Sequence, residues 1–380
     1  MSGEDIRNVT WLGLSGSARY DFRSDVVTTP TPSMLAAIAS CTLQDDVSQE
    51  DETTNDLEAY CAALTGTQSA LFVLSGTMGN QVALRALLTQ PPHSILCDSR
   101  SHIFNSEAGG VALLTSAMVH PVVPRNGLYL TLQDVEDHFQ AAGSIIGCPT
   151  RVISLENTLY GVIAPLEEVR QISAFAKKNN VKMHCDGARL WEAVAAGAGS
   201  LTDYVACFDT VTLCFSKGLG APVGSILIGN LETIQVARHI RKAIGGGLRQ
   251  PGLVTAAARV ALDETFGTSP DGQQGFLKRS HATAKVIESM WKSIGGSTKY
   301  PVHTNIVCIN LKDEGISLAR FNEIGQHEGL RLKGERLVVH YQIAQSADDT
   351  LERLRRVFVK AWAERGQAIS AGADANASVY

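Results

Sequence analysis

One lysine, Lys217, stands in the segment FSKGLGAPVGS, directly after the apolar run YVACFDTVTLC. A lysine between a buried strand and a glycine-rich loop lies at the carboxyl edge of a sheet, where open α/β folds bind their ligands. Upstream, HCDGAR ends another apolar run with Asp186, and Arg189 follows three positions later. An amine and a carboxylate on two strand ends indicate a shared site at that edge.

A third candidate segment lies before both Asp186 and Lys217 in the sequence. The segment LSGTMGN leads from an apolar run into the helical pattern QVALRALLTQ, so we expect the amides of Gly76, Thr77 and Met78 to face an anion at the start of that helix. An amine for a covalent link, a carboxylate for a ring nitrogen and an anion site are the three parts that pyridoxal phosphate requires. Their order on successive strand ends predicts a site for this cofactor.

Length and composition limit the other possibilities. The chain has 380 residues, 44% hydrophobic content and a formal net charge of −5, which is typical of a globular protein with a large and a small domain. No long basic block is present, so nucleic acid is not an expected partner. No apolar stretch approaches the roughly twenty residues of a membrane span, and the N-terminus lacks a signal-peptide core. We therefore predict a cytoplasmic protein without a membrane partner.

Eight cysteines show neither CxxC pairs nor His/Cys clusters at zinc spacing. Several of them lie inside apolar runs. This pattern predicts buried, reduced thiols in a reducing compartment and no metal site.

Apolar, strand-like runs alternate with helical patterns at 80–90 and 166–180. The strand candidates are 69–76, 93–99, 118–123, 150–157, 181–188, 209–218 and 224–229. Repeated βα units predict an α/β fold with a mainly parallel sheet covered by helices on both faces. The predicted domains are an N-terminal arm (1–20), a large cofactor-binding domain (21–270), a small C-terminal α/β domain (271–366) and a flexible tail (367–380).

Motifs spread over nearly the whole chain point to one family. They are DFRSDVVTTPTPSML, SGTMGNQVAL, SHIFNSEAGG, ISLENT, HCDGARLWEA, CFSKGLGAPVGS, RKAIGGGLRQ and RLVVHYQI. With these motifs the sequence resembles the threonine aldolase family of fold-type-I pyridoxal phosphate enzymes, which are similar to beta-eliminating lyases. The resemblance implies a large domain with a seven-stranded, mainly parallel sheet and a small C-terminal domain.

The resemblance also implies roles for single residues. Lys217 resembles the aldimine lysine, Asp186 the partner of the ring nitrogen, and His102 the imidazole stacked on the cofactor ring. Gly76 and Thr77 match positions that hold the phosphate. The predicted cofactor-binding set is Gly76, Thr77, Met78, His102, Asp186, Arg189, Ser216, Lys217, Lys242 and Arg249.

Further matches concern substrate and assembly. Ser24, Arg189 and Arg336 match positions that bind the substrate carboxylate, a task suited to guanidinium groups. A helix cap for Ser24 and an ordinary surface charge for Arg336 are the alternatives. Lys242 and Arg249 match residues that reach cofactor phosphate from a neighbouring subunit, so the resemblance implies a homodimer or homotetramer with shared sites.

Three positions depart from the family pattern. Ile146 stands at the aligned position of the family's second active-site histidine, and we expect it to line the substrate pocket. Ser48 stands where a tyrosine usually follows the DDV element, and Tyr160 replaces a histidine often found after ENT. Cleavage of a β-hydroxy amino acid requires removal of the hydroxyl proton, which isoleucine cannot accept. The changes favour a short, apolar substrate side chain.

These departures predict an amino-acid racemase that interconverts L- and D-alanine through abstraction of the Cα proton, as a subset of fungal relatives of this family does. Lys217 is the expected base on one face. Tyr160, His102 or a held water supplies the proton on the other face, and the sequence does not choose among them. The alternative is an L-threonine or L-allo-threonine aldolase that releases glycine and acetaldehyde with the help of His102 and water. A non-catalytic pyridoxal phosphate protein is a third possibility.

Overall fold

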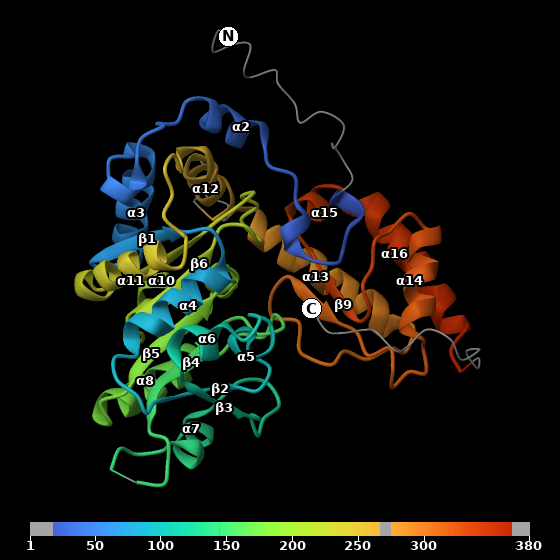
Figure 1. Ribbon diagram of the computed structural model, residues 1–380. Helices are drawn as coiled ribbons and strands as arrows, with labels where there is room; N and C mark the ends of the chain where they lie inside the picture. Colours follow the sequence, from blue (N-terminus) through green and yellow to red (C-terminus); the bar gives the residue numbers. More distant parts are fainter. Residues whose placement is uncertain (1–17, 144, 267–274, 367–380) are drawn as a thin grey trace. The chain divides into compact units, whose positions relative to one another are not determined.

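The computed structural model describes residues 18–143, 145–266 and 275–366 (Figure 1). The chain divides into two compact units. The described residues of the first unit are 30–159 and 163–263, and those of the second are 18–29, 160–162, 264–266 and 275–366.

The second unit includes the segment 21–29, which was predicted to open the large domain. Phe22 explains this, because its side chain is fully buried in the core of the second unit. Its N–H donates to the carbonyl of Arg331 (2.9 Å), and its carbonyl accepts from the N–H of Val338 (2.9 Å). The predicted tail and the predicted limit at 270 lie outside the described residues, as does most of the predicted arm.

The first unit contains a seven-stranded sheet in the order β1-β7-β6-β5-β4-β2-β3 (Figure 1). Its strands are β1 (Ser69–Val73), β2 (Ser94–Asp98), β3 (Met118–Val122), β4 (Thr150–Glu156), β5 (Lys182–Gly187), β6 (Thr210–Cys214) and β7 (Ser225–Gly229). Only β7 runs antiparallel to its neighbours. Each predicted strand is present, and the α/β fold with a mainly parallel sheet is confirmed.

Helices cover both faces of this sheet. One layer contains α3 (Glu52–Thr65), α8 (Leu166–Lys178) and α10 (Leu201–Val205), and the other contains α4 (Gly76–Leu87), α6 (Gly110–Thr115) and α11 (Leu231–Ala243). The remaining α-helices of the first unit are α2 (Pro32–Ala39), α5 (His102–Asn105), α7 (Leu132–His138), α9 (Leu190–Ala195) and α12 (Gly252–Thr265). Strands β2, β6 and β7 are buried along their whole length and are mostly apolar, because both of their faces are covered.

Helix α4 starts where β1 ends, and two glycines set its position. A Cβ atom on Gly76 would lie 2.8 Å from Sγ of Cys214, and one on Gly79 would lie 2.6 Å from Cγ2 of Thr212. Only glycine permits this approach of the helix to β6. The first turn of α4 is therefore fixed next to the end of the strand that precedes Lys217.

The second unit is built from helices around one apolar core. Its elements are η1 (Ala18–Tyr20), η2 (Asp25–Val27), α13 (Gly275–Ser293), β8 (Ile306–Cys308), α14 (Leu318–His327), β9 (Arg336–Val338), α15 (Tyr341–Gln345) and α16 (Ala347–Ala363). Strands β8 and β9 form an antiparallel pair. Trp291 of α13 and Phe358 of α16 meet edge to face, with ring centroids 5.0 Å apart, in the centre of this core.

The eight cysteines are all free thiols, and six of them are buried, as the sequence predicted. Burial raises the pKa of Cys61 and of Cys97 to about 12, so both remain protonated and inert. Among the described helices, none combines the length and the apolar character that a bilayer crossing requires.

Candidate active site

Polar groups gather at the carboxyl edge of the sheet, where β1, β2, β4, β5 and β6 all end. Gly76 follows β1, His102 follows β2, Glu156 closes β4, Asp186 lies near the end of β5, and Lys217 follows β6. Both Asp186 and Lys217 act on the pKa of His102, so these charges are close together. The predicted clustering of strand-end residues in the first unit is thus found.

Asp186 is fixed by two hydrogen bonds at its carboxylate. Its side chain is buried, Oδ2 accepts from Nδ2 of Asn80 (2.8 Å), and Oδ1 accepts from the N–H of Ala188 (3.1 Å). Each oxygen of an ionised carboxylate accepts up to two hydrogen bonds. Acceptor capacity therefore remains for the N–H of a ligand.

Asn80 connects Asp186 to two further side chains. Its Nδ2 also donates to Oε1 of Glu107 (2.8 Å), and its Oδ1 is 3.1 Å from Nε2 of His184. The second ring nitrogen of His184 is 2.9 Å from Oγ1 of Thr210. Burial lowers the pKa of His184 to about 4, so the ring is neutral, and the amide oxygen requires that Nε2 carry the hydrogen. The tautomer of His184 thereby sets the orientation of Asn80.

His102 is held at both its ring and its backbone. Its Nδ1 is 2.8 Å from Oε1 of Glu107, and its N–H donates to Oε2 of Glu156 (2.7 Å). The hydrogen bond to Glu107 raises the pKa of His102, with support from the charge of Asp186. The imidazole side chain is 35% exposed, so a ligand can contact it. One polar atom each of His102, Glu107 and Asp186 lie within 4.8 Å of one another.

Glu156 pairs in register with Asp186 across β4 and β5, so both carboxyl groups are on the same face of the sheet. Burial, and then the charge of Asp186, raise the pKa of Glu156 to about 8. His102 and Lys217 act against this shift. The cluster therefore contains a carboxyl group that keeps its proton at neutral pH.

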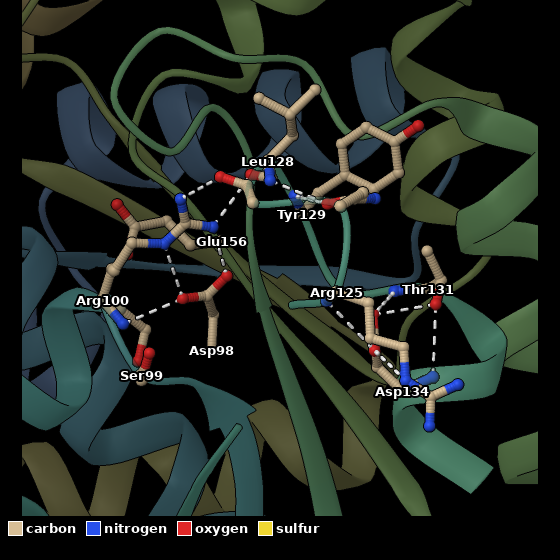
Figure 2. Close-up of polar contacts among 12 residues, drawn as sticks. Asp98, Ser99, Arg100, Arg125, Leu128, Tyr129, Thr131, Asp134 and Glu156 are labelled. Carbon is tan, nitrogen blue, oxygen red and sulfur yellow. Dashed lines mark hydrogen bonds and ion pairs between the residues drawn. The ribbon is translucent and has the colours of Figure 1, made fainter. Parts of the chain in front are cut away.

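Arg100 fixes the loop that leads to His102. Its guanidinium group makes a two-pronged contact with Asp98 at the end of β2 and donates to the carbonyls of Gly127 (2.7 Å) and Leu128 (3.0 Å) (Figure 2). The same view shows Asp134 accepting from Thr131 at the start of α7, which closes the loop on its other side. Charge-assisted bonds of this kind hold the backbone around the site in place.

The start of α4 is the predicted anion site. Ser75 caps the helix, and its Oγ accepts from the N–H of Met78 (3.1 Å). The Met78 amide is thus occupied by the cap, which contradicts its predicted contact with an anion. The amides of Gly76 and Thr77 precede the first intrahelical bond, so they remain suited to a phosphate group.

Two other predicted residues of the first unit lie at this edge. Ser216 directly precedes Lys217, and both are partly exposed. Arg189 occupies the N-cap position of α9, three residues after Asp186, without a side-chain capping hydrogen bond. Lys217 and Arg189 both oppose the rise that burial causes in the pKa of Cys214, so both cations lie near the end of β6.

Lys242 and Arg249 are exposed on the surface of the first unit. Arg249 pairs with Asp45 (2.6 Å), and its side chain is 70% exposed. Lys242 helps Arg249 to lower the pKa of Asp45, although the N–H of Val47 is the main cause. Their contact with a neighbouring subunit's cofactor stays a prediction.

Three predicted residues belong to the second unit. Ser24 caps η2, where its Oγ accepts from the N–H of Val26 (3.4 Å). The alternative that Ser24 is a helix cap is therefore observed. Arg336 begins β9. Tyr160 has a left-handed backbone (φ 52°) and stacks on Tyr300 with ring centroids 5.5 Å apart. Their roles toward a substrate stay predictions.

Ile146 is not part of the strand-end cluster. It precedes β4, so it lies toward the amino end of that strand, whereas Glu156 and Asp186 lie at the carboxyl ends. Its side chain is 96% exposed. The prediction that Ile146 lines the substrate pocket is therefore wrong for the site of its own chain.

Sequence reasoning missed Asn80, Glu107 and Glu156. Glu156 had a detectable signal, because it ends an apolar run as Asp186 does on the adjacent strand. Glu107 lies in the same motif as His102, and Asn80 is one helical turn after Gly76. Asn80 acts through contacts with Glu107, Asp186 and His184 that are distant in the sequence, which no local pattern indicates.

A family model described as beta-eliminating lyase matches residues 21–314. The chain belongs to the beta-eliminating lyase family. "Aldolase vrtJ" from Penicillium aethiopicum is 54% identical over 350 residues, covering 92% of this chain and 89% of the relative. "Alanine racemase TOXG" from Cochliobolus carbonum is 45% identical over 340 residues, covering 90% and 87%. A low-specificity L-threonine aldolase from Saccharomyces cerevisiae is 42% identical over 347 residues, covering 91% and 87%.

The fold comparison agrees with this family. The structure of threonine aldolase from Leishmania major matches with a TM-score of 0.75 at 19% identity, covering 89% of this chain and 99% of that chain. Serine palmitoyltransferase from Sphingomonas wittichii matches with a TM-score of 0.68 at 18% identity. The predicted resemblance and the fold-type-I architecture are confirmed.

Beta-eliminating lyases use pyridoxal phosphate, and this chain is a pyridoxal phosphate-dependent enzyme. The residues at the carboxyl edge fit the cofactor. The Asp186 carboxylate retains acceptor capacity for a ring nitrogen, the Gly76 and Thr77 amides suit a phosphate, and Lys217 offers an amine between them. The exposed part of His102 is the contact surface expected for the ring.

Proposed function

We propose that this enzyme is an amino-acid racemase that interconverts L- and D-alanine by removing and returning the Cα proton. Bound pyridoxal phosphate supplies the electron sink that weakens the bonds to Cα. Inversion requires one residue that accepts a proton on one face and another that donates a proton on the opposite face. Lys217 is the acceptor in this proposal, and the carboxyl edge of the first unit supplies the donor.

The protonation states around Lys217 carry the proposal. Glu107 and Asp186 favour the imidazolium form of His102, and burial favours the protonated form of Glu156. A site that combines an amine with proton donors suits inversion. Cleavage of a β-hydroxy amino acid would instead require an unprotonated group for the hydroxyl proton.

The departures at Ser48 and Tyr160 and the 45% identity to a relative named alanine racemase also support this proposal. Ile146 gives no support from within one chain, because it lies at the opposite edge of the sheet.

An aldolase that cleaves L-threonine or L-allo-threonine to glycine and acetaldehyde is the second candidate. The 54% identity to a relative named aldolase favours it. In its neutral form, His102 could accept the hydroxyl proton with the ring nitrogen that does not contact Glu107.

One assay separates the two candidates. The purified protein is supplied with pyridoxal phosphate in deuterium oxide and given L-alanine or L-threonine. We expect racemic alanine with deuterium at Cα in both enantiomers, and only slow release of acetaldehyde from threonine. The Lys217→Ala variant controls for contaminating enzymes. Acetaldehyde release much faster than alanine inversion would refute the racemase proposal.

A further inference from the structure

The sequence left three candidates for the second proton carrier: Tyr160, His102 and a held water. The structure singles out one of them through its partner, Glu107. The Glu107 side chain has no exposed surface, yet it lies beside a partly exposed imidazole at the carboxyl edge. A buried carboxylate behind an accessible histidine needs an explanation, because burial of an ionised group is costly.

We propose that Glu107 is the positioning residue that makes His102 the second proton carrier, with Nδ1–H bound to Glu107 and Nε2 exchanging the Cα proton. This inference rests on the proposed exchange of that proton. It assigns Glu107 a role that no local feature of the sequence predicted.

The hydrogen bonds fix the charge of Glu107. Its Oε1 accepts from Nδ2 of Asn80 (2.8 Å), and its Oε2 accepts from Nε2 of Gln81. Both partners are amide NH₂ groups, which can only donate. A carboxyl group whose two oxygens both face donors is stable as the anion. Glu107 therefore accepts the third bond too, and Nδ1 of His102 must carry a hydrogen.

This arrangement leaves only Nε2 of His102 available for proton exchange with a substrate. Because Nδ1–H is bound to Glu107, every proton that His102 exchanges with a substrate passes through Nε2. Asn80 orients Glu107 and Asp186 from one amide group. The pair of His102 and Glu107, called the dyad below, therefore shares one positioning residue with the predicted partner of the cofactor ring. The accessible nitrogen is thus held in a defined relation to Asp186.

The titratable groups that face His102 come from four segments. Glu107 follows α5, Asp186 belongs to β5, Glu156 ends β4, and Lys217 follows β6. Glu107 and Asp186 raise the pKa of His102, and Lys217 lowers it. The net direction is upward, which favours the protonated, proton-donating form of His102.

The proton balance closes with these two residues. In one direction, the Cα–H bond breaks and its proton passes to the amine of Lys217. The electron pair of that bond then forms a new Cα–H bond with the Nε2 proton of His102. Lys217 ends protonated and His102 ends neutral. Proton exchange with solvent resets both residues, and the reverse direction uses them in exchanged roles.

Tyr160 is a weaker candidate on structural grounds. It belongs to the second unit, where it stacks on Tyr300 and packs against the cluster of Ile306, Cys308 and Val338. This packing accounts for its aromatic ring without a role in proton transfer.

The Glu107→Gln variant tests the proposal. Glutamine keeps the size of the side chain and one acceptor oxygen for His102, but it removes the charge. The new NH₂ group would meet the Gln81 amide, whose Oε1 is buried and has no hydrogen-bond partner among the described residues. Rotation of that amide turns its oxygen toward the new donor, so a hydrogen bond between residues 81 and 107 is kept in the variant.

Carbon-13 NMR of labelled histidine in the holoenzyme gives a readout apart from turnover. The resonance that disappears in His102→Asn identifies the ring. We expect its pKa to fall by about 1 unit in Glu107→Gln, because an adjacent anion is lost. Glu107→Asp keeps the charge and should recover part of the shift. Glu136→Gln, the same change at an exposed position of α7, is the matched control.

Turnover gives the second readout. We expect alanine inversion to fall about 10²-fold in Glu107→Gln, while deuterium exchange without inversion continues at the face served by Lys217. In the direction in which His102 donates, inversion requires its protonated form, so that rate falls as the pH rises through its pKa. That decline should move to lower pH in Glu107→Gln by the shift that NMR records.

The results distinguish failure of the proposed dyad from failure of the proposed function. The proposed role of the dyad is refuted if Glu107→Gln leaves the pKa of His102 or the rate of inversion unchanged. It is also refuted if Tyr160→Phe abolishes inversion while Glu107→Gln inverts alanine normally. Absence of alanine inversion in the wild type overturns the proposed function instead. The dyad is then judged by the NMR shift and by the pH dependence of threonine cleavage, and a variant that alters neither refutes it.

Discussion

The first unit contains two buried groups of charged side chains that are built in different ways. The closed cluster consists of Asp46, Glu58, Arg238 and Arg241, in which two carboxylates face two guanidinium groups. Arg238 lies 2.6 Å from Glu58 and 3.6 Å from Asp46, and Arg241 bonds Asp46. Arg241 is 2% exposed, so the charges of this cluster neutralise one another within the fold.

The open cluster consists of His102, Glu107 and Asp186, with Lys217 and Glu156 beside it. Here Glu107 accepts from an imidazole and two neutral amides, and Asp186 accepts from a neutral amide and a backbone N–H. Guanidinium groups keep their charge at every physiological pH, whereas histidine exchanges protons near neutrality. The closed cluster thus contains cations that do not titrate near neutrality, whereas the open cluster contains an imidazole that can exchange protons there.

The largest effect is expected at Lys217. Lys217→Ala removes the amine that we propose as the acceptor of the Cα proton, so turnover should fall by at least about 10²–10⁴-fold. Because Lys217 is partly exposed, the free energy of unfolding of the apoprotein should change by only about 0.5 kcal/mol. Borohydride reduction followed by mass mapping should attach the cofactor to Lys217 in the wild type. Attachment to another lysine would contradict the assignment.

A substitution in the closed cluster should have the reverse effect of Lys217→Ala, because it should lower stability strongly. Arg241→Met leaves the buried Asp46 carboxylate without its main partner, so the free energy of unfolding should fall by about 3–5 kcal/mol. Arg170→Met breaks the exposed pair with Asp203 and should cost at most about 1 kcal/mol. Urea denaturation measures both values. Equal losses in the two variants would show that the closed cluster is not a stabilising element.

The smallest effect concerns pH. Glu156 has a folded pKa of about 8, above that of the unfolded chain, so between pH 5 and 8 the folded state holds a proton that the unfolded state has released. Its contribution therefore lowers stability as pH rises, by at most about 1.4 kcal/mol per pH unit. Glu156→Gln mimics the protonated acid and removes this dependence. Urea denaturation at pH 5.5, 6.5 and 7.5 should show the wild type losing stability relative to Glu156→Gln.

The sequence predicts the parts of the site that follow from strand ends. Asp186 and Lys217 are polar residues that end apolar runs, and parallel strands bring such ends together. Asn80 is different, because its partner Asp186 is 106 residues away and the contact depends on how α4 packs on the sheet. Such pairings follow from tertiary packing, which local patterns do not encode.

Ile146 shows how strand direction limits which residues can share a site. The resemblance places Ile146 at the aligned position of a family histidine, but a residue before a parallel strand lies at the amino edge of the sheet. The same rule that located Asp186 at the carboxyl edge therefore excludes Ile146 from it.

The strand order also affects how the chain folds during synthesis. In the sheet, β1 pairs only with β7, and Ser69 meets Gly229 in that pairing. The ribosome must therefore add about 150 residues after β1 before its partner exists, which takes roughly 10–30 s at ordinary elongation rates. Throughout that interval the apolar strand Ser69–Val73 has an unpaired edge. Nascent chains of this enzyme should depend on chaperones until β7 has left the exit tunnel.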